Sequence, residues 1–460
     1  MQQTISPVDG RVYVERPLGT ARDIEHALAA AVKAQTDWQQ LGVARRCAML
    51  SRAVDAFVAN REAIAAEITW QMGRPISQTP GEVRGFEARS RYMLSIAPDV
   101  LASIKPPQTA GFERWLERAP LGLVAVIAPW NYPYLTAVNA VIPALAAGNV
   151  VILKHSHQTP LCAERFGAAF AAAGLPAGVF QVLHLSHDET SRFIADPRVN
   201  FVCFTGSVSG GHAVQRALSA GFADAGLELG GKDPAYVRAD ADLPQAIDVI
   251  TDGAFFNSGQ SCCGIERVYV HEIVYDEFVA GVVAQVGKYR LGTPTDPATT
   301  LGPMVRTSAA AFVREQVKEA VRSGARALID RGLFPADEAG TPYLAPQVLV
   351  DVDHSMRIMT EETFGPAVGI MRVRSDDEAL HLMNDSEYGL TAALFTRDVH
   401  LARHLGARIE TGTVFLNRCD YLDPALAWTG VKNSGRGCTL SRVGYEQLTR
   451  PKSFHFRLPA

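Results

Sequence analysis

The segment 255–263 places two adjacent cysteines in a loop of glycine and small polar residues. It reads Phe-Phe-Asn-Ser-Gly-Gln-Ser-Cys-Cys, which makes the thiols Cys262 and Cys263. Such a loop can present a thiol to a cleft, and a thiolate is a strong nucleophile once its pKa is lowered. Two adjacent cysteines are more often buried and unreactive, so the loop alone only makes a nucleophile a candidate.

A glutamate with flanking leucines is the first candidate for a base. Glu228 lies in the run Leu-Glu-Leu-Gly-Gly-Lys at 227–232, at the end of an apolar stretch. In a partly apolar site its pKa would rise towards neutrality, as a general base requires. A surface carboxylate paired with Lys232 is the simpler interpretation of this run by itself.

Two further segments follow predicted strands. Asn131 comes after the strand predicted at 123–128, and its amide can donate to a developing oxyanion. A turn asparagine is the alternative. The segment 204–211, Phe-Thr-Gly-Ser-Val-Ser-Gly-Gly, opens a helix whose backbone N–H groups suit a pyrophosphate. It departs from the GxGxxG fingerprint, so a plain glycine turn is the alternative.

Alternating elements must position these residues. Apolar periodicity predicts helices within 21–72, ended by Gly73-Arg74-Pro75. From residue 121, short apolar runs alternate with helical stretches, which predicts a parallel sheet covered on both faces. The predicted strands are 123–128, 150–153, 179–183 and 201–204, and the predicted helices are 137–147, 161–173 and 189–195.

A second alternating region follows Lys232. Its predicted strands are 267–270, 344–350 and 367–373, and its predicted helices are 274–288, 308–323 and 376–384. This pattern predicts a second α/β domain. The tail, 448–458, is basic and aromatic. We expect a strand there, either pairing with a partner subunit or lying at an ordinary sheet edge.

Composition bounds the class of protein. The chain has 460 residues, 47% hydrophobic, and a net charge of −4, which suits a globular protein of two or three domains. We expect no nucleic-acid partner, no membrane span and no secretory signal, hence a cytoplasmic protein. The 7 cysteines show no CxxC spacing, so we expect scattered thiols and no metal site.

Taken together and in this order, the motifs resemble the aldehyde dehydrogenase superfamily over nearly the whole chain. The spacing of 34 residues from Glu228 to Cys262 (262 − 228) also resembles the family's. The shared motifs are 129–131 (Pro-Trp-Asn), Lys154, 204–207 (Phe-Thr-Gly-Ser), 228–232 (Glu-Leu-Gly-Gly-Lys), 259–262 (Gly-Gln-Ser-Cys), 361–366 (Glu-Glu-Thr-Phe-Gly-Pro) and 432–435 (Lys-Asn-Ser-Gly).

The resemblance implies an NAD(P)-dependent, hydrolytic oxidation of an aldehyde. Cys262 would be the nucleophile, because the family's cysteine stands three residues after Gly259. The Asn131 amide and the Cys262 N–H would hold the hemithioacetal oxyanion, and Glu228 would activate the water that hydrolyses the thioester. A CoA-acylating relative and a catalytically silent scaffold are the alternatives, and the presence of Glu228 argues against the first.

The resemblance also implies a cofactor site. Its candidates are Trp130, Lys154, His157, Gly206, Ser207, Gly211, Leu229, Glu362 and Phe364. His157 stands where the family commonly has a glutamate that would repel a 2′-phosphate. We therefore expect NADP to be accepted alongside NAD, although a merely tolerated surface histidine is an equal alternative.

The substrate is less determined. Alignment of the motifs implies an aldehyde tunnel lined by Tyr132, Thr136, Ser261, Asp420 and Trp428, together with Asn139, Cys263 and Leu422. The aromatic rings favour an apolar, aromatic or cationic group. Asp420 suits an amino aldehyde and Arg418 a carboxylate, and the sequence does not decide between them.

The implied fold is α/β, with a doubly wound parallel-sheet cofactor domain, a second α/β catalytic domain and a small β oligomerisation arm. We expect the cofactor domain at 1–101 and 120–230, the catalytic domain at 231–445, and the arm at 102–119 and 446–460. The arm implies a homodimer or homotetramer. The run 437–439, Gly-Cys-Thr, departs from the Gly-Arg-Glu of many relatives.

Overall fold

A six-stranded sheet forms the first half of the molecule. In the computed structural model, which describes residues 1–459, its strand order is β18-β8-β7-β4-β5-β6. Strands β4 to β8 run parallel, and β18 is an antiparallel edge. The strands are β4 (Leu123–Ala128), β5 (Val150–His155), β6 (Phe180–Val182), β7 (Val199–Thr205), β8 (Asp224–Glu228) and β18 (Gly435–Arg436).

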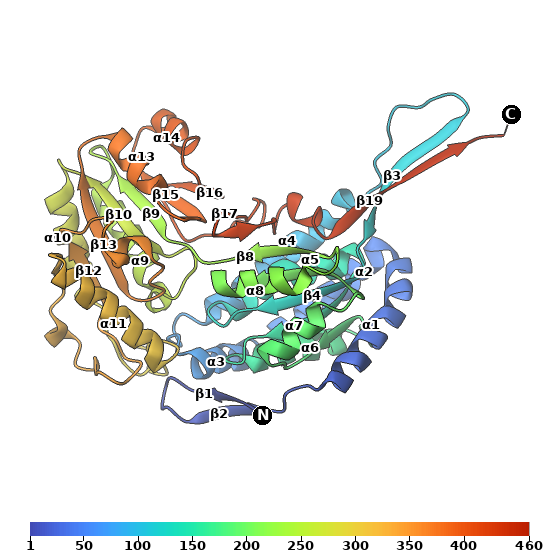
Figure 1. The fold of residues 1–460 in the computed structure, drawn as a ribbon, viewed down its shortest axis with the longest axis horizontal. Coiled ribbons are helices and arrows are strands. Elements are labelled where there is room, and N and C mark those ends of the chain that lie inside the picture. The colour runs from blue at the N-terminus through green and yellow to red at the C-terminus, as the bar shows by residue number, and fades with distance from the viewer. Residues whose placement is uncertain (460) are drawn as a thin grey trace.

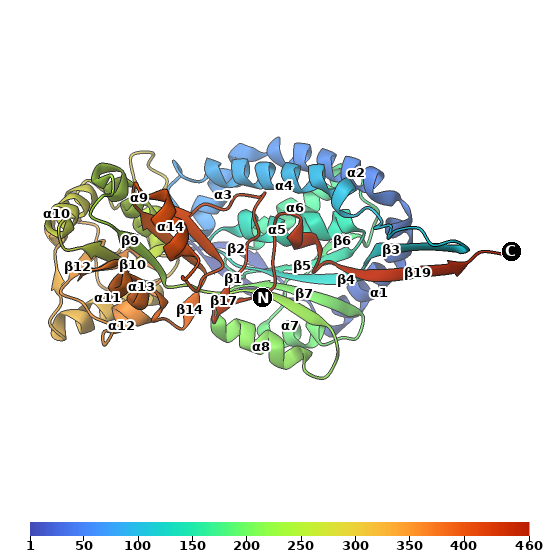
Figure 2. The same ribbon diagram turned by 90° about the horizontal axis from the view of Figure 1, so that it is seen from above.

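Helices cover both faces of this sheet. α5 (Pro133–Ala147) and α6 (Pro160–Ala172) lie on one face, and α7 (His187–Ile194) and α8 (Val208–Leu218) lie on the other (Figure 2). The chain reverses its direction of winding between β4 and β7, which creates a switch point where ligands bind beyond the carboxyl ends of strands. The predicted parallel sheet with helices on both faces is confirmed.

Four helices precede the sheet, and three of them lie in the range 21–72 that was predicted to be helical. α1 (Ala21–Gln40), α2 (Gly42–Val58) and α3 (Arg61–Met72) match the apolar periodicity, and Gly73 ends α3 in a left-handed conformation (φ 86°). α4 (Pro80–Val100) was not predicted. It packs on α5 so closely that a Cβ added at Gly85 would lie 2.5 Å from Cδ2 of Leu135.

The second half holds a seven-stranded sheet in the order β11-β12-β13-β10-β9-β15-β16 (Figure 1). All its pairings are parallel except β11 with β12. The strands are β9 (Asp233–Val237), β10 (Ile265–His271), β11 (Arg326–Ala327), β12 (Gln347–Val350), β13 (Ala367–Val373), β15 (Thr391–Phe395) and β16 (Thr413–Leu416). The predicted second α/β region is confirmed, although β12 begins at Gln347 and not at residue 344.

The helices of this half are α9 (Leu243–Phe255), α10 (Tyr275–Val286), α11 (Thr307–Arg322), α12 (Arg357–Thr360), α13 (Asp376–Asn384) and α14 (Val399–Gly406). Three of them, α10, α11 and α13, were predicted. The prediction for α13 is correct at both ends because Ser375 caps it and three acidic residues fill its first turn, where the helix dipole favours them. α9, α12 and α14 were not predicted.

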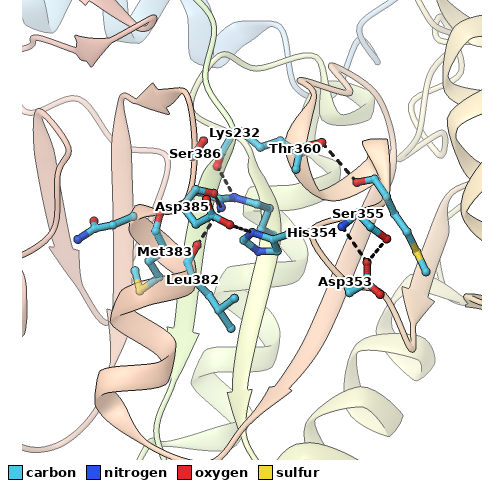
Figure 3. A network of polar contacts seen from close by, with 12 residues as sticks. Lys232, Asp353, His354, Ser355, Thr360, Leu382, Met383, Asp385 and Ser386 are labelled. Atoms are coloured by element: carbon cyan, nitrogen blue, oxygen red, sulfur yellow. Dashed lines mark hydrogen bonds and ion pairs between the residues drawn. The ribbon is translucent and has the colours of Figure 1, made fainter.

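A polar network fixes the far end of α13 (Figure 3). The buried Arg267 of β10 donates to the carbonyls of Leu382 and Met383, where a cation suits the negative end of the helix. His354 bridges Tyr269 and Asp385, at 2.8 and 2.7 Å. Every Arg267 nitrogen has an acceptor, so the network is a structural clamp.

Two long strands form an arm that projects away from both sheets (Figures 1 and 2). β3 (Phe112–Pro120) pairs antiparallel with β19 (Thr449–Arg457), from Phe112 opposite Arg457 to Pro120 opposite Thr449. Trp115 stacks on Phe454 with ring centroids 4.4 Å apart. The strand predicted in the tail is confirmed, and its partner within the chain is β3. Short pairs of β1 (Gln2–Ile5) with β2 (Val12–Arg16) and of β14 (Tyr388–Gly389) with β17 (Val431–Lys432) complete the structure.

The proposed domain boundaries stay a prediction, and one strand bears on them. β18 lies within the expected catalytic range 231–445, yet it pairs with β8 of the first sheet. Within residues 1–459, no helix is both long enough and apolar enough to cross a membrane.

Candidate functional site

A cavity of about 340 Å³ contains both Cys262 and Glu228. Its wall includes all five residues predicted to contact substrate, which are Tyr132, Thr136, Ser261, Asp420 and Trp428, and also Asn139, Cys263 and Leu422. These side chains come from α5, the end of β8, the loop after α9 and the loop after β16. Segments more than 200 residues apart in the sequence therefore meet around one space.

A strained turn presents Cys262. After α9, a single 3₁₀ turn (Phe256–Gly259) carries Asn257, Ser258 and Gly259 with φ of 53°, 57° and 70°. A Cβ at Gly259 would lie 2.3 Å from the carbonyl oxygen of Gly365, so only glycine fits there. Left-handed backbone at non-glycine residues costs free energy and concentrates at functional sites. The turn thus lifts the cysteine to the cavity wall.

The two cysteines have different surroundings. Cys263 is buried, and its thiol donates to Oδ1 of Asp420 at 2.8 Å. The adjacent Cys262 thiol and burial raise the pKa of Cys263. Cys262 is only half-buried, and among residues 1–459 its thiol is hydrogen-bonded to no side chain except that of Cys263. The thiol free to react is therefore that of Cys262.

Two threonine hydroxyls hold Glu228. Thr439 donates to Oε1 at 2.5 Å and Thr205 donates to Oε2 at 3.0 Å. Burial raises the pKa of Glu228, and the two hydroxyls oppose that rise. A second cavity of about 10 Å³, close to the size of one water, lies against Glu228, Thr205 and Thr439. Glu228 is thus a carboxyl group whose pKa is raised by burial and which lies next to a space for water.

Lys232 does not pair with Glu228, so that simpler interpretation of the sequence is wrong. The Nζ of Lys232 lies 2.6 Å from Oε2 of Glu266 and 2.9 Å from Oγ1 of Thr363. Glu266 also accepts the backbone N–H groups of Thr363 and Phe364. This buried ion pair fixes the loop that contains Glu362 and Phe364.

Gly230 and Gly231 allow three segments to meet. A Cβ at Gly230 would lie 2.4 Å from Glu362, and one at Gly231 would lie 2.3 Å from the Cys262 carbonyl oxygen. The Gly231 N–H donates to Glu362 at 3.0 Å. Burial raises the pKa of Glu362 to about 8, so its carboxyl group is mainly protonated at neutral pH and can itself donate a hydrogen bond.

Asn131 lies beside the cysteine loop and is 4% exposed. Its amide donates to the Gln260 carbonyl at 3.2 Å, two residues before Cys262. Its own carbonyl accepts from Asn257 at 3.2 Å and from Arg74. Arg74 pairs in turn with Glu82 at 2.6 Å, both fully buried. Sequence reasoning missed Arg74, Glu82 and Asn257, whose role in holding Asn131 becomes visible only in the fold.

Most residues predicted to bind the cofactor lie at strand ends of the first sheet or just after them, whereas Glu362 and Phe364 lie in the loop before β13 of the second half. Ser207 caps α8 by accepting from the Gly210 N–H at 3.2 Å, and Gly206 precedes it. Gly211 packs against Leu229, since a Cβ there would lie 2.8 Å from that side chain. Trp130 meets Phe364 edge to face, with centroids 5.6 Å apart.

Lys154 and His157 extend this group at the end of β5. Lys154 is 9% exposed, and burial lowers its pKa. His157 is exposed at the surface, where partial burial and the charges of Lys154 and Arg306 lower its pKa. Arg306, which sequence reasoning missed, adds a third basic group to this corner.

Other wall residues were also missed, and one residue suggested for the substrate lies outside this wall. Arg89 of α4, Asp252 of α9 and Tyr421 line the large cavity. Arg418, suggested for a substrate carboxylate, lines an adjoining cavity that shares part of its wall with this one, and its guanidinium lies 3.8 Å from the centre of the Tyr421 ring. Among residues 1–459, no group of three or more histidine, cysteine, aspartate or glutamate side chains is arranged to hold a metal ion.

Comparison with known proteins supplies the family. The model of the "Aldehyde dehydrogenase family" matches residues 1–454. The succinate semialdehyde dehydrogenase [NAD(P)+] Sad of Escherichia coli strain K12 is 35% identical over 445 residues, which cover 97% of this chain and 96% of that protein. Succinate-semialdehyde dehydrogenase [NADP(+)] 1 of Mycobacterium bovis is 33% identical over 455 residues, 98% of each chain.

Solved structures give the same result. The succinic semialdehyde dehydrogenase of Streptococcus pyogenes, in complex with NADP+ as the cofactor, superposes with a TM-score of 0.94 at 29% identity, over 99% of this chain and 100% of that chain. The structure of Gox0499 superposes with a TM-score of 0.94 at 34% identity, over 98% and 99%. From its first residues to its arm, the chain belongs to the aldehyde dehydrogenase family.

Proposed function

We propose that this protein oxidises an aldehyde to a carboxylic acid with NAD or NADP, through a thioester on Cys262. One observation carries the proposal: the free thiol of Cys262 and the carboxyl group of Glu228 face the same cavity, while Cys263 is buried against Asp420. A nucleophile and a base on one cavity are what thioester formation and hydrolysis require.

The reaction divides between these residues. The Cys262 thiolate adds to the carbonyl carbon, and the oxyanion accepts hydrogen bonds from the Asn131 amide and the Cys262 N–H. Loss of hydride from that carbon leaves a thioester. Glu228 takes a proton from water as the water attacks the thioester carbon, and the collapse of this adduct releases the acid and the thiolate. The cavity of about 10 Å³ beside Glu228 supports water delivery from that side.

The donor set of the first sheet fits a nicotinamide dinucleotide. The free N–H groups at the start of α8, after Ser207, suit a pyrophosphate. Lys154 and Glu362 suit ribose hydroxyls, and Trp130 with Phe364 suits the ring junction. When bound, the nicotinamide ring supplies the hydride acceptor. Relatives named for NAD(P)+ and NADP(+) support the use of both forms.

The role of Cys262 is tested by comparing its alanine variant with that of the adjacent Cys263. Cys262→Ala should lower kcat/KM for every aldehyde by at least about a thousandfold, and it should abolish the burst of reduced cofactor. Cys263→Ala should keep that burst. Equal loss in both variants, or full activity of Cys262→Ala, would contradict the proposal.

The substrate panel decides the aldehyde class and the fate of the acyl group. Relatives named for succinate semialdehyde make carboxylate-bearing aldehydes the first class to assay. Aliphatic, aromatic, amino and carboxy aldehydes should be compared with each cofactor by absorbance of the reduced form. The free acid should appear without added CoA; formation of product only with CoA would favour an acylating enzyme.

We also propose that the β3–β19 arm joins subunits into a homodimer or homotetramer. We propose in addition that residues 1–101 and 120–230 form the domain that binds the cofactor, and that residues 231–445 form the domain that carries the nucleophile. The arm supports the first part, because an isolated two-stranded ribbon is marginally stable in water and its edges are free to pair. The strand ends that carry Ser207 and Lys154 support the second.

A further inference from the structure

Arg89 is a cavity-facing guanidinium that forms no ion pair within residues 1–459. Its Nη1 donates to the Leu135 carbonyl at 2.6 Å and to Oδ1 of Asn139 at 3.2 Å. Its Nε and Nη2 donate to no protein atom of the described chain, although the side chain lines the cavity that holds Cys262 and Glu228. One edge of a planar, two-pronged donor is thus free.

Other inward-facing arginines of the molecule are used differently. Arg74 pairs with the carboxylate of Glu82 at 2.6 Å. All three nitrogens of Arg267 donate to acceptors of the protein. Arg89 is held in place through a single nitrogen, and it keeps the geometry that matches a carboxylate with two parallel hydrogen bonds.

The packing of α4 on α5 puts Arg89 there and leaves room in front of it. Gly85, one turn earlier on α4, allows contact with Leu135, whose carbonyl anchors Arg89. Gly85 and Ala88 also line the cavity. The residues beside Arg89 on this stretch of α4 that line the cavity therefore have small side chains.

Two acidic groups of the cavity accept hydrogen bonds from side chains other than Arg89. Glu228 accepts from Thr205 and Thr439, and Asp420 accepts from Cys263 and Ser261. Burial raises the pKa of Asp420 to about 6 and raises those of Glu228 and Asp252 as well. A guanidinium stays protonated at neutral pH even where burial lowers its pKa, as it does for Arg89. Arg89 forms no ion pair with these carboxyl groups within residues 1–459, and its Nε and Nη2 stay available to an added carboxylate.

We propose that Arg89 binds the carboxylate of an ω-oxo acid, an aldehyde with a carboxylate at its far end, while Cys262 attacks the aldehyde carbon. This inference rests on the proposed function and names the group that would give it substrate specificity. Asn139, which accepts from Arg89, orients the guanidinium and acts as a positioning residue.

The test compares substrates of matched chain length that carry a carboxylate, a methyl group or an amine: 4-oxobutanoate, pentanal and 4-aminobutanal. In Arg89→Met, the ratio of kcat/KM for 4-oxobutanoate to that for pentanal should fall roughly thirtyfold or more, mainly through KM. In Arg89→Lys, which keeps the positive charge, this ratio should fall less than in Arg89→Met. Arg84→Met, on the exposed side of the same helix, should keep the wild-type ratio.

Two kinetic results would overturn the proposal. Equal losses for both substrates in Arg89→Met would mean that Arg89 only ties α4 to α5. A wild-type preference for 4-aminobutanal over 4-oxobutanoate would mean that the acidic groups govern the cavity.

Binding of succinate, measured by calorimetry, separates this inference from the proposed function. If no aldehyde is oxidised with either cofactor, the proposed function fails. Succinate binding that is lost in Arg89→Met and kept in Arg84→Met would still support the carboxylate site. Equal binding by wild type and Arg89→Met, or none by either, would overturn it.

Discussion

At the scale of single residues, the site is governed by what each reactive group touches. Cys262 and Cys263 are adjacent in sequence, yet only Cys263 is buried and engaged with Asp420. Glu228 lies between two hydroxyl donors, so its pKa reflects burial opposed by hydrogen bonds. The two thiols therefore differ in exposure and in hydrogen bonding, because different side chains contact each of them.

The hydroxyl of Thr439 should tune the base. Thr439→Val removes a hydrogen bond that favours the charged form of Glu228, so the pKa of Glu228 should rise further. Since the base acts when deprotonated, the acid limb of the kcat profile should move to higher pH. At pH 7, kcat should fall roughly five- to tenfold.

Rescue distinguishes this effect from a packing defect. Thr439→Ser keeps the hydroxyl and should restore the wild-type pH profile. Slower hydrolysis in Thr439→Val should also leave a burst of about one reduced cofactor per active site in rapid-mixing experiments. An unchanged acid limb in Thr439→Val would refute the role.

His157 should determine the tolerance of a 2′-phosphate. His157→Glu places a negative charge beside Lys154 and Arg306, so kcat/KM with NADP should fall at least about tenfold while NAD is retained. His157→Ala removes the donor without adding a negative charge, so its kcat/KM with NADP should lie between those of the wild type and His157→Glu. A wild-type preference for NAD of about a hundredfold or more would contradict the expectation.

At the scale of elements, the site is made by close approach between segment ends. β4, β5, β7 and β8 end at one edge of the first sheet, and the cysteine loop and the Glu362 loop approach that edge from the second half. The glycines at 230 and 231 are required because the neighbouring backbone and carboxyl group leave no space for a Cβ. These two motif glycines therefore allow neighbouring segments to come into contact.

Gly230→Ala should therefore loosen the cofactor site without touching the nucleophile. Its Cβ would meet Glu362 at 2.4 Å and would displace that carboxyl group. We expect KM for NAD and NADP to rise together by about ten- to hundredfold. Gly221→Ala is a matched control, because no atom lies within 4 Å of its added Cβ. Unchanged KM values in Gly230→Ala would contradict this packing.

Sequence periodicity predicted many of these elements and missed others for identifiable reasons. α13 was predicted at both ends, because its cap and its acidic first turn are local signals. α4 was missed because Gly81, Gly85 and Pro98 interrupt its pattern and because it buries polar residues such as Glu82. The partners of those residues lie on α5 and in the Arg74 turn, which only the fold supplies. Arg89 was missed along with this helix.

At the scale of the whole molecule, two α/β halves lie side by side and an arm extends from the first half (Figure 1). Residues of both halves line the cavity. The arm carries exposed apolar side chains, among them Phe456 at 49% and Ile104 at 49% exposure. Exposed apolar groups beside free strand edges are typical of subunit contacts. The expected oligomer thus depends on a part of the chain that lies outside the cavity.

Truncation after Leu448 removes β19 and should convert a dimer or tetramer into monomers, measured by analytical ultracentrifugation. Removal of residues 458–460 alone leaves β19 intact and should keep the wild-type mass. If full-length protein sediments as a monomer, or the longer truncation leaves the oligomer unchanged, the arm does not join subunits.

The sequence by itself determined the family, the parallel sheets and most of the residues around the cavity, because these depend on local motifs and periodicity. Only the tertiary structure decided which groups surround each of them. Thr439 and Glu228 are 211 positions apart, yet they form a 2.5 Å hydrogen bond. Lys232 pairs with Glu266, Arg418 lines an adjoining cavity, and Arg89 lines the cavity that holds Cys262 and Glu228. Such contacts follow from helix and sheet packing, which no local pattern encodes.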